Sequence, residues 1–258
     1  VRKMWINFPA SVLIVLISML SSTSGVYVSL PIAVLWLAGP FAAYIVSKPC
    51  VKKTHRLNED DLALLRSIAR KTWRYFEDFA AEGDNYLPPD NYQEDPPKGV
   101  AHRTSPTNIG LLMLSVLCAC DMGYIGIPEM IRRYENIVST LEKMEKWKGH
   151  FYNWYNTITL EILKPAYVST VDSGNLAACL ITLREGLLEY GRPDLAARAD
   201  ALLRQMDFRP LYDESRRLFY IGINVDREEP SSGWYDLLAS EARLSGYVAI
   251  AKGDVPRR

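Results

Sequence analysis

The strongest constraint on the fold is a long stretch, Met4–Ser47, that contains no Asp, Glu, Lys or Arg. It holds two apolar runs, Trp5–Leu20 and Val26–Val46, separated by the polar run SSTSG. A membrane-spanning helix needs about 20 apolar residues, so the second run is long enough and the first is marginal. The sequence therefore predicts a two-helix transmembrane hairpin with a basic juxtamembrane segment over residues 1–53.

Basic residues flank the predicted hairpin on both sides. They are Arg2 and Lys3 before it, and Lys48, Lys52, Lys53 and Arg56 after it. Because basic residues mark the cytoplasmic side of a membrane, we expect both ends of the hairpin, and everything after Val51, to be cytosolic. A cleaved signal peptide remains an alternative for the first run.

Composition and missing motifs exclude several classes of function. The formal net charge is zero, which gives no indication of a nucleic-acid partner. The cysteines, Cys50, Cys118, Cys120 and Cys179, form no C-x-x-C pair, and the last three lie in apolar runs, which predicts buried reduced thiols. The chain has no phosphate-binding or dinucleotide-binding glycine motif, no zinc-ligand spacing and no G-x-S-x-G. We therefore expect no metal and no cofactor.

From Asn58 onward, helix-start signals recur and two kinds of helix alternate. The expected helices span residues 58–79, 106–120, 128–146, 176–190, 193–206 and 234–251. The expected N-caps are Asn58, Ser105, Asp172 or Ser173, and Ser231 or Ser232. Amphipathic helices alternate with helices that are apolar nearly all round, which is typical of an α/α toroid whose inner helices line a central pit. Segments 149–170 and 211–226 predict short β-hairpin insertions, so the fold class is all-α with small hairpins.

Polar residues cluster at the starts of the expected inner helices. GVAHRTSPTNIG (residues 99–110) contributes His102, Arg103, Thr104 and Asn108, and VDSGN (171–175) contributes Asp172 and Asn175. If the inner helices run parallel, these starts converge at one mouth, where free backbone N–H groups add donors. Ordinary capping is the alternative, and it accounts for the serines but not for His102, Arg103 or Asn108.

Two loops carry further candidates. YLPPDNYQEDPP (residues 86–97) presents Asp90, Asn91 and Glu94 in a proline-stiffened segment, with a solvated acidic loop as the alternative. Trp154 and Tyr155 lie between asparagines, a mixture of flat apolar faces and amides that suits a neutral polyhydroxylated ligand. Packing within a sheet is the alternative for these two aromatic residues.

Glu241 is the candidate for acid–base chemistry. It lies in the middle of the expected helix 234–251, on a largely apolar face. Burial there would raise its pKa, as a general acid requires. A buried ion pair with Arg243 is the alternative, and Arg243 is itself a candidate binding residue.

Six ordered motifs resemble the cyclic β-1,2-glucan synthases in their middle, glycoamylase-like region. They are TWRYFEDF, YLPPDNYQE, VAHRTSPTNIGL, GHFYNWYNT, YVSTVDSGNLA and YDLLASEARLSGYVAIAKGDVP. The resemblance implies an (α/α)6 toroid that closes linear β-1,2-glucan into rings by retaining transglycosylation. It assigns the acid/base role to the glutamate of S-E-A-R, Glu241. It also implies a bacterial inner membrane location, with β-1,2-glucan, membrane lipid and the remaining synthase domains as partners.

The resemblance further implies that residues 54–258 are the N-terminal half of the toroid, truncated, with the nucleophile beyond the last residue. We therefore expect a fragment of a larger synthase that is inactive by itself. Two alternatives stay open: a non-catalytic glucan-binding or scaffold membrane protein, and part of a hydrolase of linear β-1,2-glucan.

Overall fold

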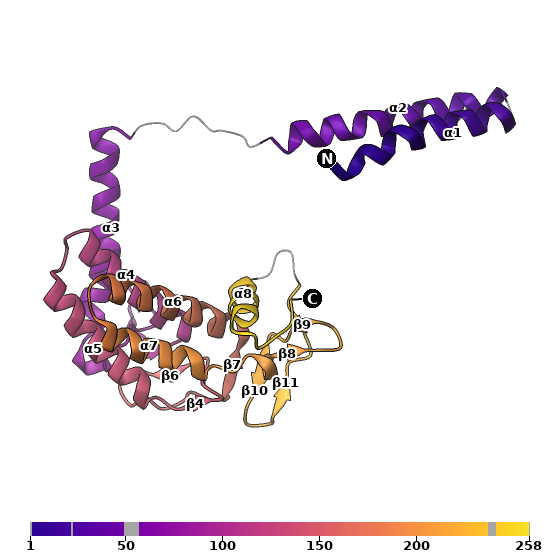
Figure 1. Cartoon of the computed structure of the whole chain (residues 1–258). Helices are drawn as coiled ribbons and strands as arrows, with labels where there is room; N and C mark the ends of the chain where they lie inside the picture. Colours follow the sequence, from indigo (N-terminus) through magenta and orange to yellow (C-terminus); the bar gives the residue numbers. More distant parts are fainter. Residues whose placement is uncertain (1, 22, 49–56, 237–240, 258) are drawn as a thin grey trace. The chain divides into compact units, whose positions relative to one another are not determined.

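The computed structural model describes all residues except 1, 22, 49–56, 237–240 and 258 (Figure 1). The chain forms two compact units, Val1–Asn58 and Glu59–Arg258, and each is described by itself. The predicted basic flank at Lys52, Lys53 and Arg56, and the thiol of Cys50, lie outside the described residues.

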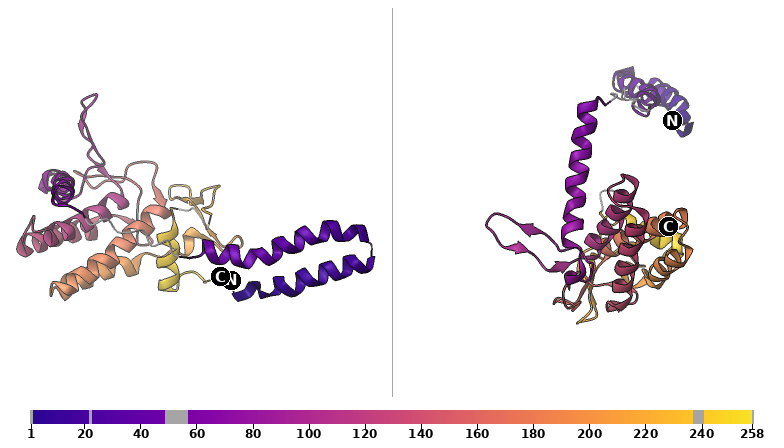
Figure 2. Two further views of the ribbon diagram at one scale, coloured as in Figure 1. Left: turned by 90° about the horizontal axis from the view of Figure 1, so that it is seen from above. Right: turned by 90° about the vertical axis from the view of Figure 1, so that its left-hand side faces the viewer.

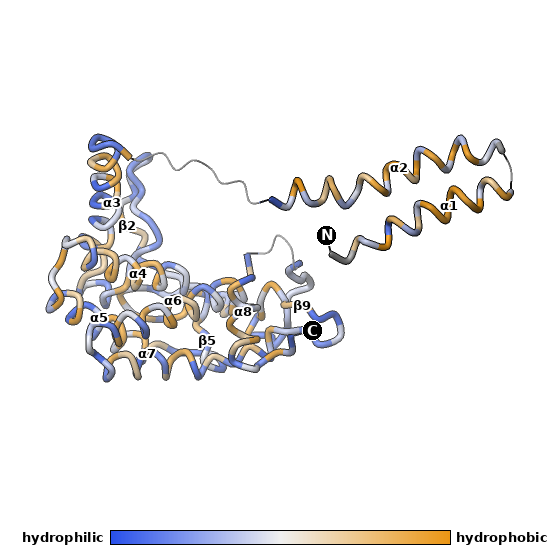
Figure 3. The backbone as a smooth tube through the Cα atoms, turned by 45° about the horizontal axis from the view of Figure 1, so that its top comes forward, coloured by the Kyte–Doolittle hydropathy of each residue, from blue (hydrophilic) through white to orange (hydrophobic). Residues whose placement is uncertain are grey.

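The first unit is a pair of apolar helices. A short 3-10 helix, Arg2–Ile6, leads into α1 (Asn7–Ser21), and α2 (Thr23–Val46) packs along α1 (Figure 1). Both helices are mostly apolar, with hydrophobic residues recurring along their length (Figure 3). Each is long and apolar enough to cross a membrane, a test that an N-terminal signal sequence also passes. The predicted pair of apolar N-terminal helices is confirmed.

The second unit contains inner and outer helices in alternation. The outer helices are α3 (Glu59–Phe79), α5 (Ile127–Lys143) and α7 (Pro193–Gln205); the inner ones are α4 (Pro106–Asp121), α6 (Thr170–Glu189) and α8 (Arg243–Lys252). α6 packs against α4 on one side and α8 on the other, while α5 and α7 pack together outside them (Figures 1 and 2). The predicted alternation of the helices is confirmed.

Close backbone packing holds α8 against the first turns of α6. Gly174 of α6 faces Ser245 of α8, and a Cβ atom at Gly174 would lie 2.1 Å from Ser245 Oγ. The Ser245 hydroxyl donates a 2.6 Å hydrogen bond to the carbonyl oxygen of Thr170. Because Thr170 and Gly174 both lie near the N-terminus of α6, these contacts with Ser245 place the start of α8 next to the polar start of α6.

The remaining regular structure is short. Two-residue strands pair antiparallel as β1 (Tyr92–Gln93) with β2 (Gly99–Val100), β3 (Arg103–Thr104) with β6 (Tyr155–Asn156), β4 (Lys146–Trp147) with β5 (His150–Phe151), and β8 (Tyr212–Asp213) with β9 (Leu218–Phe219). β10 (Gly222–Asn224) lies between β7 (Tyr167–Ser169) and β11 (Glu229–Pro230). Single-turn 3-10 helices occur at Glu82–Asp84 and Arg209–Leu211. The short strands predicted in segments 149–170 and 211–226 are confirmed.

Two predicted helix starts are wrong. α6 begins at Thr170 and is capped by Ser169, whose side chain accepts from the Asp172 N–H group, so neither Asp172 nor Ser173 is the cap. α8 begins at Arg243. Ser231 does not cap it, because its hydroxyl accepts from the Gly222 N–H group and donates to the Gly233 carbonyl.

Burial also differs from expectation on α4. The sequence predicts a helix buried all round, but Leu111 and Cys118 are exposed. Cys118, Cys120 and Cys179 are free thiols, as expected, but only Cys179 is buried. Burial raises the pKa of the Cys179 thiol to about 11, so it stays protonated.

Candidate functional site

The first turns of α4 and α6 are joined by a carboxylate. The Thr107 hydroxyl donates to Asp172 Oδ1 at 2.6 Å, and the Thr107 N–H group donates to the same oxygen at 3.3 Å. Asn175 Nδ2 in turn donates to Thr107 Oγ1 at 3.1 Å. Asp172 lies in the first turn of α6, where the helix dipole favours a negative charge. The structure thus brings together the polar starts of two inner helices.

The side chain of Asn153 extends this network to Trp154. With its amide nitrogen toward Asp172, Asn153 donates to Asp172 Oδ2 at 3.0 Å, and its amide oxygen accepts from Trp154 Nε1 at 3.0 Å. The backbone N–H group of Asn153 donates to the Tyr167 carbonyl at 2.7 Å, which fixes the loop beside the strand that leads into α6. Asp172 therefore accepts on both carboxylate oxygens, and the Trp154 ring has a fixed orientation.

Arg103 lies against the Trp154 ring and is held by Asp90. Its guanidinium carbon is 4.8 Å from the ring centroid, a cation–π arrangement. Arg103 Nη2 and Nε donate to Asp90 Oδ2 at 2.8 and 3.1 Å. Asn108 Nδ2 lies 3.5 Å from Asp90 Oδ1, and Asn91 Nδ2 donates to Asp90 Oδ2 at 3.0 Å. We call this continuous set, which runs from Asp90 through Arg103, Trp154 and Asn153 to Asp172, the polar network.

His102 and Glu94 lie apart from the polar network. His102 Nδ1 is 2.7 Å from Asp84 Oδ1, and the Thr157 hydroxyl donates to the same carboxylate oxygen. His102 therefore pairs with Asp84, whereas its neighbour Arg103 pairs with Asp90. Glu94 is exposed in the turn between β1 and β2.

Two predicted binding residues are packing residues instead. Tyr155 is fully buried, donates from its hydroxyl to the Glu145 carbonyl at 2.7 Å and accepts there from the Tyr152 N–H group at 2.8 Å. Burial raises the pKa of this phenol far above its usual value. Thr104, which pairs with Tyr155 across β3 and β6, is also fully buried. Neither side chain can reach a ligand in this structure, because both point into the core.

The expected environment of Glu241 is wrong. Glu241 is exposed and lies in a turn two residues before α8, not in the middle of a helix on a buried face. Burial therefore gives no reason to assign Glu241 the role of a general acid. Its expected helical neighbours Leu237 and Leu238 fall outside the described residues.

Electrostatics nevertheless relate Glu241 to the polar network. The pKa of the Tyr235 phenol is raised, first by burial and then by the negative charges of Glu241 and Asp172, with Tyr167 contributing as well. Tyr235 therefore lies within electrostatic reach of both carboxylates. Sequence reasoning missed Tyr235, whereas Thr107 and Asn153 lie inside the candidate stretches 99–110 and 149–170.

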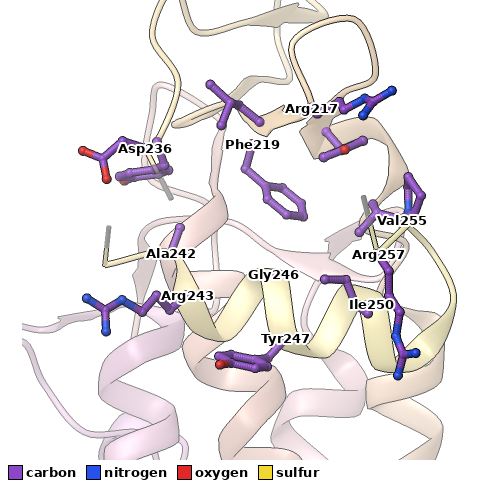
Figure 4. A pocket seen from close by; sticks show the side chains of 14 residues that line it. Arg217, Phe219, Asp236, Ala242, Arg243, Gly246, Tyr247, Ile250, Val255 and Arg257 are labelled. Carbon is purple, nitrogen blue, oxygen red and sulfur yellow. The ribbon is translucent and has the colours of Figure 1, made fainter. Parts of the chain in front are cut away.

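Beside Glu241, α8 and the β8–β9 hairpin enclose a cavity of about 400 Å³ (Figure 4). Phe219 points into it, Tyr247 and Ile250 of α8 line one wall, and charged residues lie at its edge. Arg243, the first residue of α8, is one of these charged residues and is exposed. Within the described ranges, no group of three or more His, Cys, Asp or Glu side chains is arranged to hold a metal ion.

The arrangement suits a neutral ligand with many hydroxyl groups. Trp154 supplies a flat apolar surface, Asn108, Asn153 and Asn175 supply amides, and the Asp90 charge is compensated by Arg103. Amides and carboxylates around a ring surface can pair with hydroxyl groups while the ring covers apolar C–H groups.

Comparison with curated proteins finds a relative by sequence. The chain is 45% identical over 191 residues to a cyclic β-(1,2)-glucan synthase, NdvB, of Rhizobium meliloti (strain 1021). The match covers 73% of this chain and 7% of the synthase, so the chain spans a small part of that relative's length. No family model matches the chain.

Solved structures share the fold. A glucoamylase-like protein from Bacteroides fragilis is 25% identical, with a TM-score of 0.62 over 78% of this chain and 48% of that one. An endo-β-1,2-glucanase from Chitinophaga pinensis, solved with sophorotriose and glucose, is 21% identical, with a TM-score of 0.62 over 76% of this chain and 48% of that one. The alternating helices of residues 59–258 therefore belong to a glucoamylase-like α/α architecture.

Proposed function

We propose that residues 59–258 bind a β-1,2-glucan chain and support its closure into a ring, on the basis of the 45% identity to a cyclic β-(1,2)-glucan synthase over 73% of this chain. The reaction is a retaining transglycosylation, in which a glycosidic bond is broken and remade with a hydroxyl of the same chain. The observation that carries the proposal is the polar network, because it joins a fixed aromatic face to amides and a carboxylate at the N-termini of two inner helices.

The proposed binding roles follow from the network. A glucosyl ring packs its C–H face on Trp154, whose orientation Asn153 fixes. Asn108 and Asn175 offer amide groups to sugar hydroxyls, and Arg103 offers donors that Asp90 does not use. Asp172 acts by holding Asn153 and Thr107 in place, since both of its oxygens already accept hydrogen bonds.

Glu241 is the proposed acid/base residue. It would protonate the leaving glycosidic oxygen and then take the proton of the incoming hydroxyl. Its position in the S-E-A-R motif supports this role. A retaining mechanism also needs a second carboxylate, the nucleophile, about 5–5.5 Å from the first.

The binding part of the proposal is tested by titrating the purified full chain with linear β-1,2-gluco-oligosaccharides, in a detergent without a sugar headgroup. Trp154→Ala should abolish or strongly weaken binding. The matched control is Trp147→Ala, because Trp147 is also half-buried but lies outside the network. Absence of β-1,2-glucan binding by the unaltered chain, or equal affinities of the Trp154→Ala variant and the unaltered chain, would contradict the proposal.

A hydrolase of linear β-1,2-glucan is the second candidate, favoured by the shared fold with the Chitinophaga pinensis endo-β-1,2-glucanase. The two reactions differ in their products. A complete protein that contains this segment should release cyclic glucans without new reducing ends if it cyclises, and linear fragments with new reducing ends if it hydrolyses. Glucan binding without either product would identify a non-catalytic scaffold.

The proposed location is the bacterial inner membrane, with residues 59–258 in the cytosol. The two apolar helices and the basic residues on both sides of them support it. Membrane lipid and the other domains of a synthase would then be the partners. Reporter fusions placed after Val51 should be active only as cytosolic reporters; activity only outside the cytosol would reverse the orientation.

A further inference from the structure

A groove between α3, α4 and the β1–β2 hairpin lies next to the polar network. It encloses about 570 Å³, which is within the range of small-ligand sites, about 300–1,000 Å³. Figure 2 shows the hairpin standing out from the helical layers beside α3. The groove shares Asp90 and Asn108 with the polar network, so the two surfaces are continuous.

Stacked aromatic rings form one wall of the groove. The rings of Phe79 and Tyr92 stack with their centroids 5.4 Å apart and an interplanar angle of 22°. Phe79 is backed by Tyr75, whose ring centroid is 5.3 Å away and whose hydroxyl donates to the Pro89 carbonyl at 2.8 Å. Tyr92 is still 48% exposed. One face of Tyr92 is therefore held in place by Phe79, and the opposite face is left for a ligand.

The charges in the groove cancel. Arg74 pairs with Asp78 at 3.1 Å, and Asp90 pairs with Arg103 at 2.8 Å. Lys71 and Glu94 also line the groove and carry opposite charges. An anionic or cationic ligand gains little from such a surface, whereas a neutral ligand with hydroxyl groups can pair with Asn91 and Asn108 and cover the exposed ring.

We propose that this groove is a second subsite for the glucan chain, which binds sugar units distant from those on Trp154 and gives the site a preference for longer chains. The inference rests on the proposed function, since it takes β-1,2-glucan as the ligand of the polar network. Tyr92 is its stacking residue, and Asp90 with Asn108 connects it to Trp154 through Arg103.

The test measures affinity against chain length. Linear β-1,2-gluco-oligosaccharides from the disaccharide upward are titrated into the full chain in a detergent without a sugar headgroup, with Tyr92→Ala, Tyr92→Phe and Trp154→Ala in parallel. The unaltered chain should bind longer oligosaccharides more tightly. Tyr92→Ala should lose this increase of affinity with chain length, which amounts to about three- to tenfold for one stacking ring. The affinity of this variant for the shortest ligand should be unchanged. Tyr92→Phe keeps the ring and should keep the gain.

A second variant guards against a folding defect in Tyr92→Ala. Leu111 is exposed and lines the groove, so Leu111→Trp should narrow the groove and remove the same gain in affinity without disturbing the core. If the unaltered chain binds β-1,2-glucan but both folded variants keep its length dependence, the second subsite is wrong and the proposed function stands. If the unaltered chain binds no β-1,2-glucan at any length, the proposed function fails and this inference fails with it.

Discussion

The Thr107 hydroxyl donates a 2.6 Å hydrogen bond to Asp172 Oδ1, and the Thr107 N–H group donates to the same oxygen. This one carboxylate oxygen thus ties the first turn of α4 to the first turn of α6, two segments separated by 65 residues of sequence. Asp172 is also the acceptor that orients Asn153 and, through it, Trp154. The relationship therefore links the stability of the inner helices to the shape of the candidate site.

Thr107→Val should destabilise the second unit by about 1–3 kcal/mol, because it leaves a half-buried carboxylate oxygen and the Asn175 amide short of a partner. Urea unfolding followed by circular dichroism measures the change. Thr182→Val is the matched control, since the Thr182 hydroxyl is exposed and bonds only the Ala178 carbonyl of its own helix. Equal effects of the two substitutions would contradict a special role for the Thr107 contact.

Gly174→Ala should push α8 away from α6. The added Cβ would lie 2.4 Å from the backbone nitrogen of Ser245, which cannot move aside as a flexible side chain can. We expect a loss of about 1–3 kcal/mol in the free energy of unfolding.

Gly246→Ala is the matched control on α8, where nothing lies within 4 Å of the added Cβ. A glycine in a helix interior costs about 0.5–1 kcal/mol relative to alanine, so this variant should be stabilised. A neutral or stabilising effect of Gly174→Ala would show that α6 and α8 do not pack as described.

His150 should make the stability of the second unit depend on pH. Burial lowers the pKa of His150 from 6.5 to about 4, and its Nε2 lies 2.7 Å from the Asp207 carbonyl oxygen. The unfolded chain binds a proton near pH 6.5 and the folded one does not until about pH 4. The contribution of neutral His150 to the free energy of unfolding is therefore fully present above pH 6.5. It is lost as the pH falls toward 4, at about 1.4 kcal/mol per pH unit.

Urea unfolding of the unaltered chain and of His150→Gln between pH 7 and pH 4.5 checks this expectation. Glutamine can still donate to the Asp207 carbonyl but does not titrate, so the variant should show a smaller fall in stability with acid. Parallel pH profiles of the two proteins would rule out His150 as the cause.

Glu241→Gln, installed in a complete synthase that contains this segment, should reduce ring closure by about 10²–10⁴-fold, the usual contribution of general acid–base catalysis. Glutamine keeps the shape of the side chain but cannot exchange a proton. Linear β-1,2-glucan should then accumulate while chain elongation continues. Mass spectrometry of the released glucans distinguishes rings from linear chains by the mass of one water.

Glu228→Gln is the control for this experiment, because Glu228 is also exposed and lies outside the polar network. If the Glu241→Gln synthase made cyclic glucan at the parental rate, the acid/base assignment would be wrong. Asp172 and Glu94 would then be the next carboxylates to test.

Local sequence signals located most of the helices. Ser105 followed by Pro106 predicts the start of α4 because the cap and the first helical residue act within one turn, and the structure confirms it. The long charge-free run likewise predicts α1 and α2, since length and hydropathy are properties of the segment itself. The alternation of apolar and amphipathic helices predicts which helices lie inside, because each apolar face must be covered.

The start of α8 and the partners within the site were decided by contacts between distant segments. Residues 234 and 235 look helical in sequence. In the structure, however, the Tyr235 backbone N–H group donates to the Phe219 carbonyl, and Trp234 forms a β-bridge with Tyr220. This strand pairing overrides the local preference, and Glu241 lies exposed before the helix. Trp154 and Tyr155 are neighbours of the same type, yet one faces the site and the other the core. The pairing of β3 with β6 turns Tyr155 toward the core, whereas Trp154 precedes the strand and is held by Asn153.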